Sequence, residues 1–354
     1  MSSSLPTRII IRCDGGTAIG MGHVIRCMAL ADMLKGDFQI HFVIQETAER
    51  VYETLHTGHF EYSVTPFTND YAEDLEELKK IIQPSDIVVL DGYNFKTDYQ
   101  LGVRKLGNKL VVIDDLHDWH QVADVVINHA GGVQKELYSA EKYTKFFLGY
   151  NFRMLRSEFL GRHKEKKIKE SVHSVFISMG AADEHNNTCK FAKACLEFDD
   201  ITEVDLMVSV LNPHLFLIDQ LRSEHPHRVN VLFNLTSNEL YSKLEKSDLV
   251  IAPASTISLE SCAVGVGLLT GCTAINQNDN YKGLLQAKVC YGMDDLNNAT
   301  LSEIENRILH IKNNIVQLNF LIKNQSVIFG EDPTVKFQSI FKSLIVESND
   351  REKE

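Results

Sequence analysis

A histidine at the end of a glycine-rich segment is the residue best suited by type and position to do chemistry. The segment, residues 12–26, reads RCDGGTAIGMGHVIR and follows the apolar run Arg8–Ile11. Its glycines allow backbone N–H groups to approach a ligand closely, and the predicted helix that follows offers unpaired N–H donors at its positive end. We therefore expect Gly20 and Gly22 to contact an anionic or polar substrate. The spacing matches neither the dinucleotide-binding G-x-G-x-x-G pattern nor a Walker loop.

His23 stands where this loop becomes a helix, at the carboxyl edge of the predicted sheet, which is where open α/β sheets bind ligands. An imidazole that titrates near neutral pH is suited to removing a proton from water. The alternative is a histidine that only caps the helix or packs locally. The glycine-rich setting and the nearby Asp14 favour the catalytic interpretation.

Polar residues also follow two further apolar runs of the first half. Asp91 and Tyr93 come after one run, and Asp114 and Asp115 come after the next. Because the carboxyl ends of parallel strands share one rim, all four are candidates for a ligand site. Asp115 is interpreted as the cap of a following helix, since aspartate at a strand end often has that role. Tyr93, together with Asp14, is favoured for a catalytic role.

The second half places small residues between a predicted strand and a predicted helix at two points, residues 178–183 (SMGAAD) and residues 252–260 (APASTISLE). Ser255 and Thr256 can offer a diphosphate their hydroxyls together with helix N-terminal amides. Glu260 lies further along the same helix, and a carboxylate can accept hydrogen bonds from both hydroxyls of a diol. Its alternative interpretation is an exposed helix glutamate.

Metal ligation has little support in the sequence. His117, His120 and His129 lie near one another, but they form neither an H-E-x-x-H motif nor a set with cysteine. The seven cysteines are an odd number without C-x-x-C pairs, which indicates buried reduced thiols. We expect neither a metal ion nor a cofactor.

Short apolar runs recur along both halves and alternate with segments of helical pattern, which predicts a doubly wound α/β sheet in each half. The predicted strands are Arg8–Ile11, Ile40–Val43, Ile87–Leu90, Leu110–Ile113, Val125–Ile127, Ser174–Ser178, Val204–Val210, Val229–Leu232, Leu249–Ala252 and Val266–Leu269. After residue 300, apolar residues at steps of three and four predict an amphipathic helix. They are Ile304, Ile308, Ile311, Ile315, Leu318 and Leu321.

A chain of 354 residues fits two domains of about 150 residues each. The charged stretch 162–170 has the composition of an exposed linker, so the boundary is placed there. The predicted limits are 1–160 for an N-terminal domain and 172–320 for a C-terminal domain, followed by a helix and tail over 321–354.

The overall charge excludes one broad class of function. The formal net charge is −12, so the chain lacks the basic surface that nucleic-acid binding requires. No apolar run reaches the roughly 18–20 residues of a membrane helix, and the first residues lack the features of a signal peptide. We expect a cytoplasmic monomer whose partner is a small molecule.

Several motifs together resemble a known family. The most specific is Arg-x-Asp followed by Ile-Gly-x-Gly-His-x-x-Arg, present as Arg12, Asp14, residues 19–23 and Arg26. Supporting matches are residues 113–116, 155–159 and 180–186, Ser255 with Thr256 and Glu260, and Asn276 with Gln277. Over about residues 7–295 the chain resembles the UDP-2,4-diacetamido-2,4,6-trideoxy-β-L-altropyranose hydrolases of pseudaminic acid biosynthesis, relatives of GT-B glycosyltransferases of the MurG type.

This resemblance implies two Rossmann-like domains of GT-B type with a cleft between them, UDP held by the C-terminal domain and the sugar facing the glycine-rich loop. His23 falls on the family's proposed general base and Glu260 on its nucleotide-sugar-binding glutamate. The implied substrate-binding residues are Gly20, Gly22, Arg26, Gly180, Asp183, Asn186, Ser255, Thr256, Glu260, Asn276 and Gln277. Two glycine pairs of the family are altered, to Gly180-Ala181 and to Pro253-Ala254, and the added side chains are expected to narrow the phosphate loop.

The implied reaction is hydrolysis of a UDP-sugar by attack of water at C1 with inversion and cleavage of the C–O bond. Two alternatives stay open. A GT-B glycosyltransferase could place an acceptor hydroxyl where the water stands, because fold does not settle function. The altered glycines also leave room for a non-catalytic protein that binds nucleotide sugars.

Overall fold

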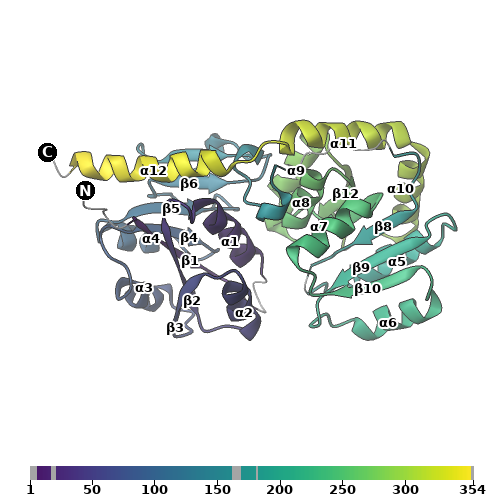
Figure 1. Cartoon of the computed structure of the whole chain (residues 1–354), viewed down its shortest axis with the longest axis horizontal. Helices are drawn as coiled ribbons and strands as arrows, with labels where there is room; N and C mark the ends of the chain where they lie inside the picture. Colours follow the sequence, from purple (N-terminus) through teal and green to yellow (C-terminus); the bar gives the residue numbers. More distant parts are fainter. Residues whose placement is uncertain (1–5, 17–20, 162–168, 181, 352–354) are drawn as a thin grey trace. The chain divides into compact units, whose positions relative to one another are not determined.

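The computed structural model describes residues 6–16, 21–161, 169–180 and 182–351, with only the backbone described from residue 346 onward. The chain divides into two compact units (Figure 1). The N-terminal unit comprises Met1–Ser157 and Asp332–Glu354, and the C-terminal unit comprises Glu158–Glu331. Each unit is built around one parallel sheet.

The N-terminal unit contains a seven-stranded sheet in the order β3-β2-β1-β4-β5-β6-β7. Its strands are β1 (Arg8–Cys13), β2 (Gln39–Gln45), β3 (Glu61–Thr65), β4 (Ile87–Asp91), β5 (Lys109–Ile113), β6 (Val125–Asn128) and β7 (Lys145–Leu148). All neighbouring strands are parallel. The strand order reverses between β1 and β4, and sheets of this type bind ligands at the carboxyl ends of the strands that flank such a reversal.

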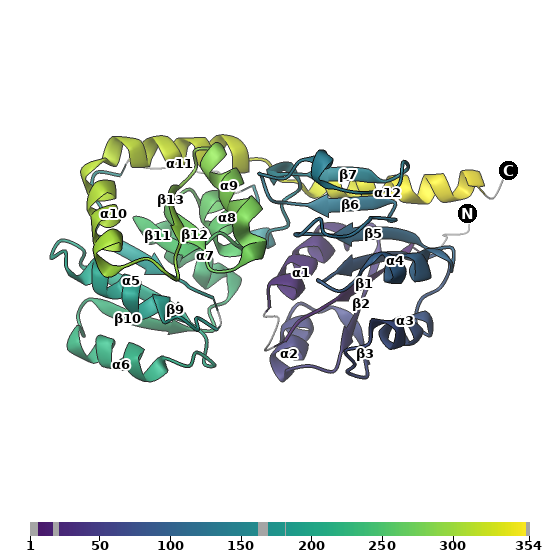
Figure 2. The ribbon, with the colours of Figure 1, turned by 180° about the vertical axis from the view of Figure 1, so that it is seen from behind.

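Helices cover both faces of this sheet. They are α1 (Gly22–Leu34), α2 (Glu49–Thr57), α3 (Tyr71–Lys79), α4 (Thr97–Arg104) and α12 (Thr334–Arg351), with short 3₁₀ turns at Lys135–Leu137 and Tyr150–Phe152. Helix α12, yellow in Figures 1 and 2, comes from the far end of the sequence and packs beside α1. Phe337 and Phe341 are fully buried there, and the side-chain amide of Gln338 donates to the carbonyl of Met33 at 3.1 Å. The last helix therefore completes the first unit.

The C-terminal unit repeats the plan with six parallel strands in the order β10-β9-β8-β11-β12-β13. The strands are β8 (Ser174–Ile177), β9 (Glu203–Val208), β10 (Val229–Phe233), β11 (Leu249–Pro253), β12 (Gly267–Cys272) and β13 (Tyr291–Asp295). The helices are α5 (Asn187–Leu196), α6 (Leu215–Glu224), α7 (Ser237–Lys246), α8 (Thr256–Val264), α9 (Asn278–Gln286), α10 (Leu301–Asn313) and α11 (Ile315–Phe329), with 3₁₀ turns at Ser157–Phe159 and Ile275–Gln277. Here too the strand order reverses, between β8 and β11.

The predicted class, two α/β domains with doubly wound parallel sheets, is confirmed, and each of the ten predicted strands overlaps an observed one. Strands β3, β7 and β13 were not predicted from the sequence. All three lie at a sheet edge, where one side faces solvent and a continuous apolar run is not required. The sequence YGMDD of β13, with a glycine and two aspartates, shows how weak the strand signal becomes at such an edge.

The prediction of a single helix after residue 300 is wrong in one respect, because the structure has two consecutive helices there. The helix is interrupted at Asn314, whose φ of −125° and ψ of 52° are not helical. The apolar pattern therefore belongs to two helices, α10 and α11. The Asn314 side chain donates to the carbonyl of His310 at 2.6 Å, which satisfies a group left open at the end of α10. Apolar periodicity continued across the break because both helices bury one face on the same core.

The domain limits predicted from the sequence are 1–160, 172–320 and 321–354, and they remain predictions. The structure shows in addition to which unit the last part of the chain belongs. Helix α11 continues to Phe329 within the C-terminal unit, and the chain from Asp332 onward belongs to the N-terminal unit. No helix within the described ranges has both the length and the apolar character to cross a membrane. All seven cysteines are free thiols, and six of them are buried.

Candidate active site

His23 is held by a buried carboxylate from a neighbouring strand. It lies in the first turn of α1, and its Nδ1 is 2.7 Å from Oδ1 of Asp91, the last residue of β4. His23 is 4% exposed and Asp91 is fully buried. The edge of the His23 ring meets Tyr93, with ring centroids 4.7 Å apart and planes at 76°. The imidazole is thus fixed in both position and orientation.

Arg26 donates hydrogen bonds to Asp91, the carboxylate that contacts His23. One turn further along α1, its Nε donates to Oδ2 of Asp91 at 2.7 Å and its Nη2 donates to Oδ1 at 2.5 Å. Its Nη1 donates to both oxygens of Asp115 at 2.7 Å. The thiol of Cys27 donates to Oδ2 of Asp91 at 3.2 Å. Every described contact of Asp91 is therefore to a donor, which keeps it ionised.

The contacts also determine which nitrogen of His23 carries the proton. Nδ1 lies near both Asp91 and Nη2 of Arg26, at 2.7 and 3.0 Å, and it cannot donate to one while accepting from the other. Nη2 of Arg26 has its shorter contact with Asp91, and an ionised carboxylate accepts more strongly than an imidazole. We therefore assign the proton to Nδ1, which leaves the lone pair on Nε2.

The two carboxylates near His23 are held in their ionised form. Burial works against ionisation of Asp91 and Asp115, but the charge of Arg26 and its hydrogen bonds outweigh burial and hold both carboxyl pKa values below their usual range. The His23 imidazole therefore lies beside two carboxylates and one guanidinium, which together carry a net charge of −1. Nearby His129 adds no charge near pH 7, because burial, assisted by Arg26, lowers its pKa to about 4.

A small cavity of ≈ 10 Å³ adjoins this cluster. Its lining residues are His23, Arg26, Gly92, Tyr93, Ile113, Asp114, Asp115, Leu116 and Trp119. A cavity that can hold one water molecule needs about 10–15 Å³ by this measure, together with polar partners. The volume and the polar lining therefore suit one water beside the imidazole.

Asp14 belongs to a second buried network rather than to His23. Oδ1 of Asp14 accepts from Nη1 of Arg12 at 2.9 Å, and Oδ2 accepts from the hydroxyl of Tyr71 at 2.8 Å. Arg12 is fully buried and also donates to Asp74, which accepts in turn from the hydroxyl of Tyr99 at 2.7 Å. This network fixes Asp14 at the carboxyl end of β1.

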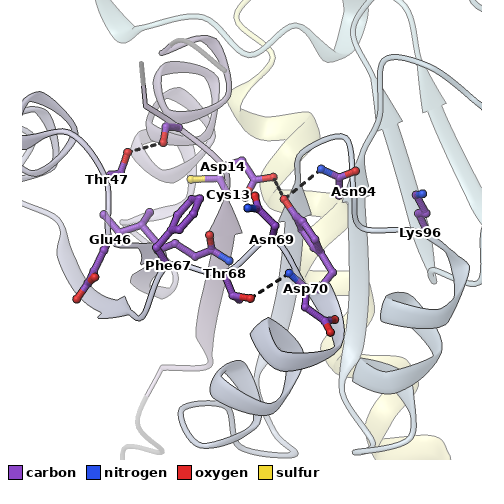
Figure 3. Close-up of a pocket in the computed structure, with 14 residues that line it drawn as sticks. Cys13, Asp14, Glu46, Thr47, Phe67, Thr68, Asn69, Asp70, Asn94 and Lys96 are labelled. Carbon is purple, nitrogen blue, oxygen red and sulfur yellow. Dashed lines mark hydrogen bonds between the residues drawn. The ribbon is translucent and has the colours of Figure 1, made fainter. Parts of the chain in front are cut away.

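Asp14 also lines a much larger pocket of ≈ 700 Å³, drawn in Figure 3. The pocket lies at the carboxyl ends of β1 and β2, and the start of α3 forms another wall. Its lining residues are Cys13, Asp14, Gly15, Ile44, Gln45, Glu46, Thr47, Phe67, Thr68, Asn69, Asp70, Tyr71, Asn94 and Lys96. All of them belong to the N-terminal unit, and none lines the small cavity at His23.

In the C-terminal unit, side-chain hydrogen bonds hold the loop between β11 and α8 in place. The hydroxyl of Ser258 donates to the carbonyl of Pro253 at 2.6 Å, and the amide of Asn280 donates to the carbonyl of Ala254 at 3.0 Å. Ser255 precedes α8 without capping it through its side chain, and the first turn of α8 contains no acidic residue. The amides and the positive end of this helix are thus not neutralised by a side chain of that turn.

Pro253 and Ala254 were expected to narrow the phosphate loop. Both residues are buried, and the Ala254 amide donates to the carbonyl of Gly271 at 2.8 Å. Glu260 is also buried, at 2% exposed, so it is not the exposed helix glutamate considered as an alternative.

The other predicted binding residues of this unit lie in loops at the same sheet edge. Gly180 has a φ of +86°, which glycine adopts without strain. Asp183 accepts from the amides of Asn187 and Thr188 at 2.8 and 2.9 Å, so its carboxylate caps α5. Asn186 precedes that helix in the left-handed conformation, with φ at 52°.

Asn276 and Gln277 form part of the 3₁₀ turn after β12. Oε1 of Gln277 accepts from the amide of Thr273 at 2.7 Å, so this side chain shapes the loop itself.

The structure corrects one interpretation made from the sequence and adds a residue to the site. Asp115 was expected to cap a helix, but β6 follows it as the next regular element and its carboxylate binds Arg26. Asp91 was one of several strand-end candidates and was not chosen, yet it is the carboxylate that contacts His23. Gly22 is the first residue of α1, and Gly20 lies outside the described residues.

Among the described side chains, no group of three or more histidine, cysteine, aspartate or glutamate residues lies close enough together to hold a metal ion.

Comparison with known proteins finds distant relatives, and no model of a known protein family matches the chain. The chain is 24% identical to an uncharacterized protein of Methanocaldococcus jannaschii, over 94% of this chain and 70% of that protein. It is 22% identical to the spore coat polysaccharide biosynthesis protein SpsG of Bacillus subtilis, over 73% of this chain and 75% of that protein. It is 21% identical to the UDP-2,4-diacetamido-2,4,6-trideoxy-beta-L-altropyranose hydrolase of Campylobacter jejuni, over 76% of this chain and 93% of that protein.

Solved structures resemble the chain over nearly its whole length. MurG of Acinetobacter baumannii matches with a TM-score of 0.64 and 13% identity, over 96% of this chain and all of that one. HepE of Anabaena, solved in complex with UDP and glucose, matches with a TM-score of 0.64 and 11% identity, over 96% and all of that chain. At these identities the likeness shows the fold, and it confirms the predicted GT-B type.

Proposed function

We propose that the protein is a nucleotide-sugar hydrolase that releases UDP from UDP-2,4-diacetamido-2,4,6-trideoxy-β-L-altropyranose, a step of pseudaminic acid biosynthesis. The observation that carries the proposal is the fixed pair of His23 and Asp91, at 2.7 Å, beside a cavity suited to one water. The hydrolase of Campylobacter jejuni among the distant relatives supports the choice of substrate.

In the proposed reaction, Nε2 of His23 takes a proton from water as the water oxygen attacks C1 of the sugar. A bond forms between that oxygen and C1, the bond between C1 and the UDP oxygen breaks, and the anomeric centre inverts. Asp91 accepts the Nδ1–H hydrogen bond throughout and stabilises the imidazolium that forms. Arg26 keeps Asp91 ionised and in place.

Two further side chains have positioning roles in this proposal. Tyr93 packs its ring against His23, which limits rotation of the imidazole. Asp14 faces the larger pocket from the end of β1, where it can accept hydrogen bonds from the sugar.

We assign UDP to the C-terminal unit. The amides at the start of α8, together with Ser255 and Thr256, would bind the diphosphate, and the amides would stabilise the charge that grows on it as it leaves. Glu260 would bind the ribose, and Gly180, Asn186, Asn276 and Gln277 would line the nucleotide site. Because UDP is a stable anion, it needs less help from acid catalysis than the leaving group of a simple glycoside.

The experiment that tests this function is a proton NMR time course with the proposed substrate in the presence of EDTA. The wild type is expected to produce UDP and the free sugar, and His23→Ala should be slower by roughly 10²–10⁴-fold. Calorimetric titration with UDP should give the same affinity for both proteins, which separates loss of the base from loss of folding. The matched control His120→Ala alters a partly exposed histidine and should keep full activity.

Two results would overturn the proposal. An unchanged substrate signal with the wild type would exclude this hydrolysis. Faster consumption of the substrate when a sugar acceptor is added, with a glycoside as product, would identify a glycosyltransferase instead. Equal rates for the wild type and His23→Ala would leave hydrolysis standing but remove His23 from the mechanism.

A further inference from the structure

The wall of the His23 cavity bears on which molecule can attack the sugar. We propose that Trp119, together with Leu116, keeps this cavity too small for an acceptor alcohol and thereby restricts the reaction to water. The inference rests on the proposed function, and it adds the residues that select the attacking molecule. Such a selection is needed because the same fold also serves glycosyl transfer, so the fold alone does not favour water.

The cavity has room for a water molecule but not for a larger nucleophile. Its volume of ≈ 10 Å³ is at the lower limit of the roughly 10–15 Å³ that one water requires by this measure. Every acceptor alcohol carries at least one carbon on the attacking oxygen, and that carbon needs space of its own beside the oxygen. An acceptor hydroxyl therefore cannot take the place of the water unless the wall is opened.

Trp119 and Leu116 both come from the loop between β5 and β6. Trp119 has the largest side chain of the lining and is partly buried. Neither residue belongs to the cluster of His23, Asp91 and Arg26 that prepares the base. The volume of the cavity can thus be changed without replacing a member of that cluster.

The loop that carries Trp119 is fixed on both sides of this residue. Before it, the amide of Asp114 donates to the carbonyl of Ile127 at 3.0 Å. After it, the carbonyl of His120 accepts from the hydroxyl of Thr97 at 2.7 Å. A wall held in this way keeps its shape when a molecule approaches, so it excludes larger molecules by size.

Lys96 holds the Trp119 ring itself. Its ammonium lies 4.5 Å from the ring centroid, within the range of a cation–π attraction. Lys96 belongs to the segment just before α4, the helix whose Thr97 also binds the loop. The ring and its loop are therefore held by the same neighbouring segment.

The large pocket does not give an acceptor another way to His23. Among the described residues, the pocket and the cavity have no lining residue in common. Gly92 lines the cavity, and a Cβ there would overlap Oδ2 of Asp14, which lines the pocket, and the ring of Phe95. Closely packed atoms therefore separate the two spaces at this point.

Methanol, the smallest alcohol, tests the wall. Its oxygen can form the bond to C1 in place of water, its proton passes to Nε2 of His23, and the bond from C1 to the UDP oxygen breaks, which gives a methyl glycoside. With UDP-2,4-diacetamido-2,4,6-trideoxy-β-L-altropyranose in aqueous methanol, the wild type is expected to release almost only the free sugar. Trp119→Ala should raise the ratio of methyl glycoside to free sugar at least about tenfold, because a tight pocket discriminates one extra carbon by roughly 10–200-fold.

Proton NMR measures both products, and their ratio does not depend on how much of the protein is folded, because both come from the same active molecules. Leu116→Ala removes less volume from the same wall and should raise the ratio less. The matched control Asp118→Ala changes the exposed neighbour of Trp119, which does not line the cavity, and should give the wild-type ratio. A sample without protein corrects for spontaneous methanolysis.

The outcomes separate this inference from the proposed function. Hydrolysis by the wild type with an unchanged product ratio in Trp119→Ala and Leu116→Ala would overturn the assignment of the wall and leave the hydrolase intact. A methyl glycoside formed as readily by the wild type as by Trp119→Ala would do the same.

If the wild type does not consume the compound, the proposed function fails, and carbethoxylation of His23 by diethyl pyrocarbonate tests the wall. Mass spectrometry follows the modification, with the buried His129 of the same protein as the measure of folding. Faster modification of His23 in Trp119→Ala than in the wild type and Asp118→Ala, with His129 still protected, supports the wall. Equal rates for His23 in all three proteins overturn it.

Discussion

The two units share a parallel-sheet plan but differ in what they bury. Within the described residues, the N-terminal unit buries many acidic, basic or histidine side chains: Arg12, Asp14, His23, Arg26, Asp74, Asp86, Asp91, Lys109, Asp124, His129 and Arg153. The C-terminal unit buries three, Asp183, Asp205 and Glu260. At its sheet edge it buries neutral groups such as Ser258, Thr270 and Asn280.

This difference suggests that the N-terminal unit is suited to proton transfer and the C-terminal unit to anion binding. Moving a proton requires charges held at fixed positions in a medium that screens them weakly, and the cluster of His23, Asp91 and Arg26 meets that requirement. Binding an anion is better served by backbone amides and hydroxyls, which attract it without needing a buried counter-charge, and the start of α8 offers both. We therefore expect substitutions in the cluster of His23, Asp91 and Arg26 to affect kcat and those at the start of α8 to affect the affinity for UDP.

The largest effect is expected from Asp91→Asn in the N-terminal unit. The amide cannot stabilise the imidazolium and can force the wrong tautomer on His23, so kcat should fall by roughly 10²–10⁴-fold. The affinity for UDP should not change. Steady-state kinetics and calorimetry measure both, with Asp118→Asn as the control, since Asp118 is an exposed carboxylate of the N-terminal unit. A variant that retains full kcat would show that the carboxylate has no part in the reaction.

The next effect concerns stability. Asp74→Asn leaves the buried Arg12 with only Asp14 as its charged partner, and breaking a buried pair costs about 3–5 kcal/mol of unfolding free energy. In the C-terminal unit, Asp205→Asn breaks a pair with the partly exposed Lys243 and should cost about 1 kcal/mol.

Urea unfolding checks these two values. Fluorescence of Trp119, the single tryptophan, reports on the N-terminal unit, and circular dichroism reports on the whole chain. Equal losses in the two variants would contradict the contrast between the units.

A smaller effect should appear as pH falls. His129 has a pKa of about 4 in the folded protein against 6.5 when unfolded, because burial disfavours its charged form. Below pH 6.5 His129 is protonated in the unfolded chain but stays neutral in the folded protein until the pH approaches 4. The free energy of unfolding therefore decreases as the pH falls from 6.5 toward 4. Between pH 7 and pH 5 the unfolding free energy should drop by about 2 kcal/mol from this residue.

Comparison with His129→Gln isolates this contribution. The variant should lose about 2 kcal/mol less than the wild type over the same pH interval in urea unfolding followed by Trp119 fluorescence. His120→Gln, at a partly exposed site, should follow the wild type. Parallel pH profiles for the wild type and His129→Gln would show that His129 protonates freely in the folded state.

The smallest effect is expected in the C-terminal unit. Ser255→Ala removes one hydroxyl from the proposed diphosphate site, which is worth about 1 kcal/mol, so the Kd for UDP should rise about fivefold. The value of kcat should change little. Ser223→Ala on α6 removes an exposed hydroxyl and serves as the control in calorimetry. A large fall in kcat with unchanged affinity would break the proposed division between the units.

Much of the fold could be predicted because apolar runs of buried parallel strands leave a clear signal. Strands β1, β4, β5 and β11 are buried along almost their whole length, and each was found. The edge strands β3 and β13 carry no such run, and the short apolar run Phe146–Leu148 of β7 was not interpreted as a strand. The return of α12 to the N-terminal unit could not be predicted either, because an amphipathic helix does not specify which core it will cover.

The site could be predicted only in part for a similar reason. The glycines before His23 drew attention to that histidine, and the structure places the Tyr93 ring against it. Asp91 lies 68 positions from His23 and meets it because β4 pairs with β1 across the reversal of strand order. That order depends on long-range packing, which periodicity along the chain does not encode. The partner of Arg26, Asp115, was missed for the same reason.

The central claim is that His23 directs water to C1 of the sugar, and hydrolysis in water enriched in oxygen-18 tests it most directly. We predict that mass spectrometry finds the label in the released sugar and none in UDP, and that NMR of the first product formed shows the inverted anomer. Label in the β-phosphate of UDP would mean attack at phosphorus, and it would contradict the assignment of His23 as the base for attack at C1.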